Sequence, residues 1–268
     1  MKQLQTGQFY GQTNDTLCLD GVTLTDTEYT VEKVDWHYHK NAYFTFILQG
    51  KLIEGNKKEI YNCSTGELLF HNWQEPHYNI KPAGFTRGFH IEVEQKWMDD
   101  FSLDLNNLQG SIRISDPDIK FSLYKIFKET KISDTITSLS LQGLLLQTLA
   151  GLKSIHYTSE RSKPLWVNKV NEILHDTMAE KLSLIDLSGN LGIHPVHLSR
   201  DFSKYFHCSM GEYIRKLKVE KSLVMLSDKK YSLMDISFEC GFSDQSHFIR
   251  CFKEITGINP LAYRRLLS

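Results

Sequence analysis

The chain has 268 residues, of which 41% are hydrophobic and 24% charged, and its formal net charge is −1. This length is comfortable for two domains, and the composition is typical of soluble globular proteins. No apolar run reaches the eighteen or so residues that a membrane span needs, and the N-terminus lacks the apolar stretch of a secretory signal. Five cysteines without metal-type spacing favour free thiols in a reducing compartment, so we expect a cytoplasmic protein.

The sequence pattern of the first third of the chain is typical of short β-strands. Residues 29–34 and 43–48 are rich in β-branched and aromatic side chains, and turn signals punctuate the sequence as far as residue 94. These signals are Gln49-Gly50, Gly55-Asn56, Thr65-Gly66 and Ala83-Gly84. Several short strands at this spacing predict a small all-β barrel or sandwich over residues 1–110.

Two short motifs in this region resemble those of the cupin barrel. The first is Trp36-His37-Tyr38-His39 followed by Gly50, and the second is Gly66 followed by Pro76-His77. The resemblance implies a module that senses a small-molecule effector and dimerises.

The histidines of these motifs leave two interpretations open. His37, His39 and His77 could supply three nitrogen ligands to a metal, since His37 and His39 lie two apart on one strand and share a face. The cupin motif usually has a glutamate a few residues later, where this chain has Asn41-Ala42-Tyr43-Phe44. We therefore assign no metal and no cofactor, and we expect these histidines to line a pocket or to fill the core.

Aromatic and imidazole side chains with polar tips suit a small-molecule pocket, and they suit a filled barrel core nearly as well. The predicted effector-binding residues are Trp36, His37, His39, Tyr43, Trp73, His77 and His90. The sequence shows no nucleophile-base pair, phosphate loop or paired catalytic carboxylates, so we predict no catalytic residues and no enzyme.

Residues 111–156 read as a helical hairpin. Asp116-Pro117 is a helix-start signal, and a second, leucine-rich helix is expected from about Asp134. The leucine face either packs on the barrel or makes a dimer contact. The polar, non-periodic segment 157–164 ends in Pro164 and is the predicted linker to a helical domain over 165–268.

Two stretches near the C-terminus repeat each other. The run from Gly192 to Phe202 matches the run from Gly241 to Phe252, which has one extra residue. After that insertion, Leu198, Arg200, Phe202 and Tyr213 correspond to Phe248, Arg250, Phe252 and Tyr263 at an offset of 50. A repeat confined to one domain implies a duplicated supersecondary unit.

Each copy has the sequence pattern of a helix-turn-helix. A short helix begins after a serine cap, Ser183 in the first copy and Ser232 in the second, and ends at Gly192 or Gly241. The second helix starts at Pro195 in the first copy, and at Asp244, capped by Ser243, in the other. The positions expected to be apolar and buried are Leu184, Leu187, Leu191, Leu198, Phe202, Tyr205 and Phe206, then Leu233, Ile236, Phe238, Phe248, Phe252 and Ile255.

The opposite faces of the two second helices carry donors at helical spacing, as a helix in the major groove of DNA requires. These are His197, Arg200 and Lys204 in the first copy and Ser246, Arg250 and Lys253 in the second. Either helix alone fits an ordinary solvated face, but matched arginines in two copies favour DNA binding. The residues from Thr158 onward contain 16 Lys and Arg against 13 Asp and Glu, a small excess of the right sign.

The run from Gly241 to Lys253, with Thr256-Gly257, Pro260 and Tyr263-Arg264, resembles the signature of the AraC/XylS family of transcription regulators. The resemblance covers about 100 residues. It implies a seven-helix domain with two helix-turn-helix units that place recognition helices in successive major grooves. The DNA contacts would fall on Val196, His197, Ser199, Arg200 and Lys204, and on Gln245, Ser246, His247, Ile249, Arg250 and Lys253. His194 and Asn259 depart from the residues usual in the family.

The predicted fold class is therefore α+β with two domains: a cupin-like β-barrel with a helical hairpin, then an all-α domain with two helix-turn-helix units. We predict a dimeric regulator that binds double-stranded DNA, contacts RNA polymerase and responds to an effector in the barrel. The resemblance favours activation over repression. Two alternatives stay open, a metal-dependent cupin enzyme tethered to DNA and a regulator that needs no ligand.

Overall fold

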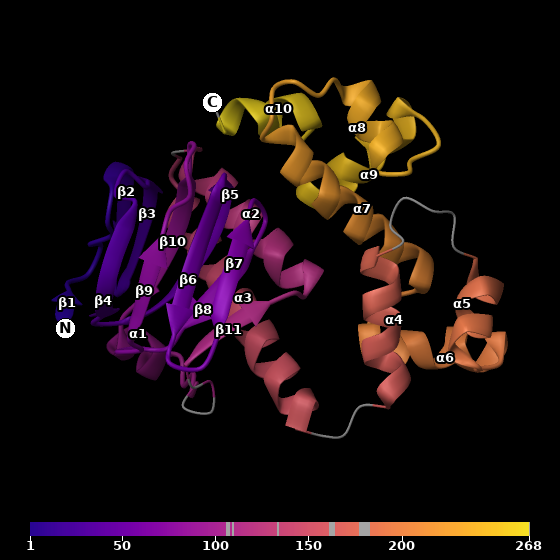
Figure 1. Ribbon diagram of the computed structural model, residues 1–268, viewed down its shortest axis with the longest axis horizontal. Helices are drawn as coiled ribbons and strands as arrows, with labels where there is room; N and C mark the ends of the chain where they lie inside the picture. The colour runs from indigo at the N-terminus through magenta and orange to yellow at the C-terminus, as the bar shows by residue number, and fades with distance from the viewer. Residues whose placement is uncertain (106–107, 109, 133, 161–163, 177–182, 268) are drawn as a thin grey trace. The chain divides into compact units, whose positions relative to one another are not determined.

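The computed structural model describes residues 1–105, 108, 110–132, 134–160, 164–176 and 183–267, and for 155–160, 171, 175 and 176 the backbone alone. The chain divides into two compact units, Met1–Lys153 and Ser154–Ser268 (Figure 1). The first unit is rich in β-sheet and the second is helical, which is the predicted fold class. Residues 157–160 of the predicted linker continue a helix, and 161–163 lie outside the described residues. The predicted domain boundaries therefore stay predictions.

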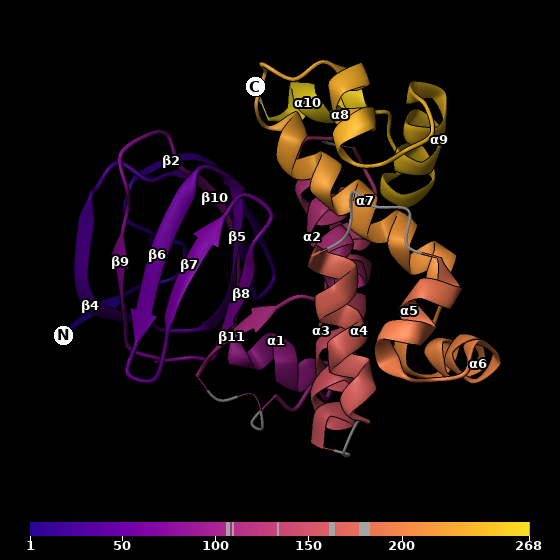
Figure 2. The ribbon, with the colours of Figure 1, turned by 45° about the vertical axis from the view of Figure 1, so that its right-hand side comes forward.

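The strands of the first unit form two sheets. The five-stranded sheet has the order β1 (Lys2–Leu4), β4 (Lys33–His39), β9 (His77–Ile80), β6 (Lys51–Asn56) and β7 (Ile60–Ser64). The six-stranded sheet has the order β11 (Ser111–Ile114), β8 (Leu68–His71), β5 (Ala42–Gln49), β10 (Arg87–Val93), β3 (Val22–Glu28) and β2 (Gln12–Leu19). Tyr43 of β5 reaches His77 of β9, so the sheets face each other across a shared interior (Figure 2).

Strand β5 shows how the sequence builds this interior. Side chains alternate between the two faces of a strand, so Tyr43 and Thr45 point between the sheets while Phe44 and Phe46 point away. All four are buried. Tyr43 and Thr45 lie between the two sheets, and the helix α2 (Pro117–Thr130) covers the outer face. The ring of Phe46 meets that of Tyr124 in α2 with 4.6 Å between centroids.

The helical part of this unit confirms one prediction and corrects others. Asp116 caps α2 as expected, accepting from the backbone N–H of Asp118 and Ile119. The next helix, α3 (Thr137–Glu160), begins later than residue 134. Two elements were missed, the short helix α1 (Gln95–Asp100) and strand β11, whose residues 111–114 were taken as helical. The predicted strand over residues 29–34 is wrong for 29–32, because β3 ends at Glu28 and the buried Tyr29 belongs to a connection, whereas residues 33 and 34 begin β4.

The second unit consists of seven helices among the described residues after Pro164, the number that the resemblance implied. They are α4 (Leu165–Asp176), α5 (Leu184–Leu191), α6 (Pro195–Phe206), α7 (Met210–Leu226), α8 (Leu233–Glu239), α9 (Gln245–Thr256) and α10 (Pro260–Leu266). Helix α7 bridges the two repeats. It packs on α6 and on α9, and Tyr213 and Leu217 of α7 belong to the core around α6.

The helix starts follow the predicted caps with one exception. Ser183 and Ser232 each form a capping box, with Asp186 and Asp235 respectively. Ser243 does not cap α9. Asp244 does, since the extra residue of this turn puts the Asp244 carboxylate 2.7 Å from the backbone N–H of His247.

Most of the predicted core positions are buried. Leu187, Leu198 and Phe202, with Ile236, Phe248 and Phe252, have no exposed surface. Phe238 is the clear error, with 81% of its surface exposed, because it lies two residues from Ile236 and residues two apart do not share a helix face. Leu184, Leu191, Tyr205, Phe206, Leu233 and Ile255 are half-buried.

The described helices also bear on the cysteines and on membranes. Cys208, Cys240 and Cys251 are buried thiols, as expected for small core residues. Among the described residues, no helix combines the length and the apolar character that crossing a membrane requires.

Candidate functional site

The outer face of α6 presents the side chains that the sequence assigned to DNA. Leu198 and Phe202 anchor the helix to the core, which leaves the opposite face open to solvent. Five predicted contact residues are exposed on this helix: Val196, His197, Ser199, Arg200 and Lys204. This face can offer imidazole, hydroxyl, guanidinium and ammonium donors to a groove or a phosphate.

Arg200 is already engaged within α6. Its Nε donates to Oδ1 of Asp201 at 3.0 Å, and its Nη2 lies 3.3 Å from Nδ1 of His197. The hydrogen bond from Arg200 lowers the pKa of the Asp201 carboxyl. A DNA contact by Arg200 would therefore compete with a local carboxylate.

The outer face of α9 carries the second predicted set. Gln245, Ser246, Arg250 and Lys253 are exposed, whereas His247 and Ile249 are half-buried at its edge. Ser246, Ile249, Arg250, Lys253 and Glu254 line an open hollow on this face. The position that corresponds to Asp201 is Cys251, which is buried, so Arg250 has no acidic neighbour at that point.

His247 takes part in the turn of its own unit. Its Nδ1 lies 3.0 Å from the hydroxyl of Ser243, and its ring packs edge-on against Phe242 with 5.6 Å between centroids. Its backbone N–H donates to the cap residue Asp244. Of the six residues predicted to contact DNA in the second helix-turn-helix unit, His247 is thus the one that helps most to hold the start of α9.

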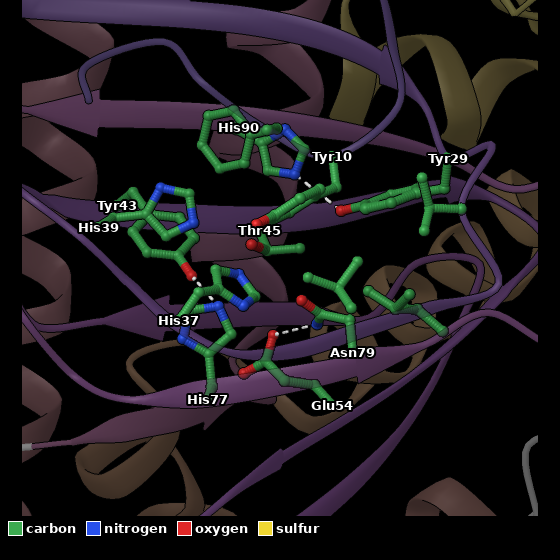
Figure 3. A pocket seen from close by; sticks show the side chains of 14 residues that line it. Tyr10, Tyr29, His37, His39, Tyr43, Thr45, Glu54, His77, Asn79 and His90 are labelled. Carbon is green, nitrogen blue, oxygen red and sulfur yellow. Dashed lines mark hydrogen bonds between the residues drawn. The ribbon is translucent and has the colours of Figure 1, made fainter. Parts of the chain in front are cut away.

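A small cavity between the two sheets contains most of the predicted effector residues (Figure 3). The predicted residues that line it are His37, His39, Tyr43, His77 and His90. Trp36 lies elsewhere, 40% exposed with its ring 5.2 Å from that of Tyr78. Trp73 lines a separate hollow with Leu103 and Leu105.

The imidazoles of this cavity are neutral at physiological pH, because burial disfavours their charged form. Burial lowers the pKa of His37, and it lowers that of His39 well below the usual range. It lowers the pKa of His77 and of His90 to about 3. Neutral imidazoles present lone pairs, so the cavity can bind a Lewis acid or a hydrogen-bond donor, and it offers an anion no positive charge from these rings.

Glu54 is a cavity residue that the sequence analysis missed. It lies on β6 two residues after the buried Leu52, so both side chains point inward. Burial raises the pKa of Glu54 to about 8, and Asn79 donates to its Oε2 at 3.3 Å. Its carboxyl is therefore mostly protonated at neutral pH. The alternation along residues 52–54 was the only sequence signal for it.

Phe9 was also missed, and it fills part of the cavity. It comes from the segment between β1 and β2, and its ring stacks on His90 with 3.7 Å between centroids and on His39 with 4.7 Å. About 20 Å³ remains open to the centre of a water molecule, which is room for one or two waters or an ion. A metabolite-sized ligand would have to displace Phe9.

Comparisons with known proteins bear mainly on the second unit. A family model described as "Helix-turn-helix domain" matches residues 187–266, which extend from α5 to α10. The Msm operon regulatory protein of Streptococcus mutans is 29% identical over 136 residues, 49% of this chain and 49% of that protein. The chain thus spans about half the length of that relative. A structure of ToxT from Vibrio cholerae covers 91% of this chain and 99% of its own, at 15% identity and a TM-score of 0.40.

One further relative settles the family. The probable transcription factor PqrA of Proteus vulgaris is 31% identical over 102 residues, which cover 36% of this chain and 84% of that protein. Helices α6, α7 and α9 and the second capping box lie within the residues that the family model matches. The chain belongs to the AraC/XylS family of transcription regulators.

Proposed function

We propose that this protein regulates transcription by binding specific double-stranded DNA through α6 and α9. The observation that carries the proposal is the duplication itself. Two helices of equal length each bury one face and expose donor side chains on the other, with Arg200 and Arg250 at corresponding positions. Unrelated solvated faces would have no reason to match in this way, whereas two half-elements of a DNA site would require it.

Helix α7 supports a two-groove mode of binding. Its 17 residues correspond to a rod of about 25 Å at 1.5 Å per residue. Because α7 packs on both α6 and α9, it can hold the recognition helices at a fixed spacing. We expect the two half-elements to lie about one helical turn of DNA apart, roughly 34 Å.

The first unit is proposed to be the sensing module. The cavity between its sheets is lined by neutral donors and acceptors within apolar walls, as small-molecule sites are. Because Phe9 occupies part of it, an organic effector would exchange places with this ring. A regulator without a ligand is the alternative, and it predicts that no metabolite raises the thermal midpoint of the protein.

Assembly, location and polymerase contact complete the proposal. Leu139, Gly143 and Ala150 lie exposed at helical spacing along α3, and we propose that this face pairs with a second copy of the chain. Binding to chromosomal DNA and reduced cysteines are both consistent with a cytoplasmic location. Family membership favours an activator that contacts RNA polymerase. The Msm operon regulatory protein and the probable transcription factor PqrA are named for regulation alone, which favours a regulator without enzyme activity.

The test is selection from random duplex DNA with the purified full-length protein at near-physiological salt, read out by sequencing. We expect enrichment of a site with two half-elements about one helical turn apart. The variant Arg200→Ala/Arg250→Ala should lose this enrichment. The control Lys57→Ala/Lys58→Ala removes the same two charges from an exposed turn of the first unit and should enrich the wild-type site. Failure of the wild-type protein to enrich any site, with weak salt-sensitive binding equal to that of the arginine variant, would refute the proposal.

A further inference from the structure

Three histidines from the two cupin-like motifs come together in the first unit. His37 and His39 lie on β4, and His77 lies on the neighbouring strand β9. Their exposed fractions are 1% to 3%, and one ring nitrogen of each lies within 4.8 Å of one ring nitrogen of each of the others. Buried imidazoles at this spacing either satisfy one another through hydrogen bonds or share a ligand.

The hydrogen bonds of His37 and His77 decide which ring nitrogen faces the cluster. Nδ1 of His37 lies 2.9 Å from the carbonyl oxygen of Asp35, and Nδ1 of His77 lies 3.0 Å from that of Glu75. A carbonyl only accepts, so each Nδ1 carries the proton and each Nε2 keeps its lone pair. Histidine ligands of metals are typically oriented in this way, by donation of the other ring N–H to a backbone carbonyl.

One ring nitrogen of His39 lacks a hydrogen-bond partner among the described residues. This nitrogen, Nδ1, is buried, and the ring is 3% exposed. A buried polar atom without a partner is destabilising. An ion in contact with this nitrogen would remove that cost.

Tyr43 adds an oxygen to the three nitrogens. Its hydroxyl lies 3.0 Å from Nε2 of His77, and its ring packs on that of His39 with 4.3 Å between centroids (Figure 3). Because Nε2 of His77 has a lone pair, the phenol donates this hydrogen bond. Two ligands at about 2.1 Å from one tetrahedral ion lie roughly 3.4 Å apart, so the oxygen already stands near the distance of a neighbouring ligand.

We propose that His37, His39, His77 and the oxygen of Tyr43 bind one transition-metal ion per chain. Tyr43 lies among residues 41–44, where the cupin motif usually has a carboxylate, and its phenol replaces that carboxylate as the oxygen ligand. Imidazole and an oxygen anion suit Zn²⁺, Cu²⁺ and iron. The ion forms its bond to the phenolate as the O–H bond breaks, and the phenolic proton leaves to solvent. Ligand atoms of a four-coordinate site lie nearer to each other than 4.8 Å, so binding of the ion would draw the three imidazoles closer together.

This site is independent of the proposed DNA binding. Its four residues all lie in the first unit, and ion binding can be measured without DNA. A metal-free protein could still bind an operator, and a metal-loaded protein could fail to do so. Each proposal can therefore fail alone.

The first experiment titrates chelator-treated, full-length protein with Zn²⁺ by calorimetry. We expect one ion per chain in the wild type and a loss of affinity of at least 100-fold in His37→Ala/His77→Ala. The control His90→Ala removes another buried histidine of the cavity that lies outside the cluster, and it should bind zinc within about threefold of the wild type. Circular dichroism establishes that each variant is folded. Zinc binding that is unchanged in the folded double variant, or absent from the wild type, would overturn the site.

The second experiment isolates the tyrosine with Cu²⁺ as the probe. A phenolate bound to Cu²⁺ gives a visible charge-transfer band that imidazole ligands do not give. We expect this band in the wild type and in Tyr29→Phe, which alters another buried tyrosine of the same cavity, and its loss in Tyr43→Phe. Tyr43→Phe should still bind one copper, about 10- to 100-fold more weakly. A band that persists in Tyr43→Phe would exclude Tyr43 as the ligand.

Discussion

In the first helix-turn-helix unit, formed by α5 and α6, a histidine caps the second helix, whereas in the other unit, formed by α8 and α9, an aspartate does. Nδ1 of His194 lies 3.4 Å from the backbone N–H of Val196, and Oδ1 of Asp244 lies 2.7 Å from that of His247. The anionic cap is the stronger one, since it is shorter and its charge complements the positive end of the helix. The two units therefore share a frame but differ in how firmly the recognition helix is held at its start.

The recognition faces differ in the same direction. Arg200 is paired with Asp201, whereas the equivalent neighbour of Arg250 is the buried Cys251. Asp201 also puts a negative charge beside a face that should approach phosphates. In the second helix-turn-helix unit, Arg250 can therefore contact DNA without first breaking an ion pair. We infer that α9 contributes more of the binding free energy and that α6 supplies a weaker second contact.

The largest expected effects are losses of stability from substitutions in the cores of the two helix-turn-helix units. Phe202→Ala and Phe252→Ala each remove a side chain without exposed surface and should destabilise their unit by about 3–5 kcal/mol. Hydrogen exchange should show protection lost first in α6 for Phe202→Ala and first in α9 for Phe252→Ala. Phe238→Ala is the matched control, because Phe238 is 81% exposed, and it should change stability by less than about 0.5 kcal/mol. Equal losses of protection in both helices from either core variant would show that the units do not open separately.

These core and cap positions were largely predictable from the sequence, because they depend on local rules. Ser183 and Ser232 were predicted as caps, and each forms a capping box. The cap of α9 was placed one residue early because Ser243 and Asp244 are both good cap residues, and only the path of the turn selects between them.

The cavity was less predictable, because it depends on contacts between distant segments. The motif residues His37, His39 and His77 were found from their spacing. Phe9 stacks on His90 from 81 positions away in sequence, and nothing in its local sequence marks it. Trp36 was predicted to line the pocket from residue type alone, but its position next to His37 puts it on the opposite face of β4.

Substitutions of Arg200 and Arg250 test whether α6 and α9 contribute unequally to DNA binding. Arg250→Ala should weaken binding to the selected site by about 1–3 kcal/mol if it reads a base, and Arg200→Ala should weaken it by less because Arg200 must first leave Asp201. Dissociation constants measured at one fixed salt concentration on the selected and on scrambled duplexes provide the check. A loss that is uniform across sequences would make Arg250 a phosphate clamp. A larger loss from Arg200→Ala than from Arg250→Ala would reverse the ranking of the two helices.

The smallest expected effect is a gain. Asp201→Asn keeps the size of the side chain, frees Arg200 from its ion pair and removes a negative charge from the α6 face, so binding should tighten by about twofold at low salt. Asp228→Asn makes the same charge change at a half-buried acid that pairs with Lys230, outside both recognition helices. If both variants tightened binding equally, the gain would come from net charge alone. A gain that is confined to Asp201→Asn, and that disappears when Arg200→Ala is added, would show that this carboxylate makes the first helix-turn-helix unit the weaker of the two in binding DNA.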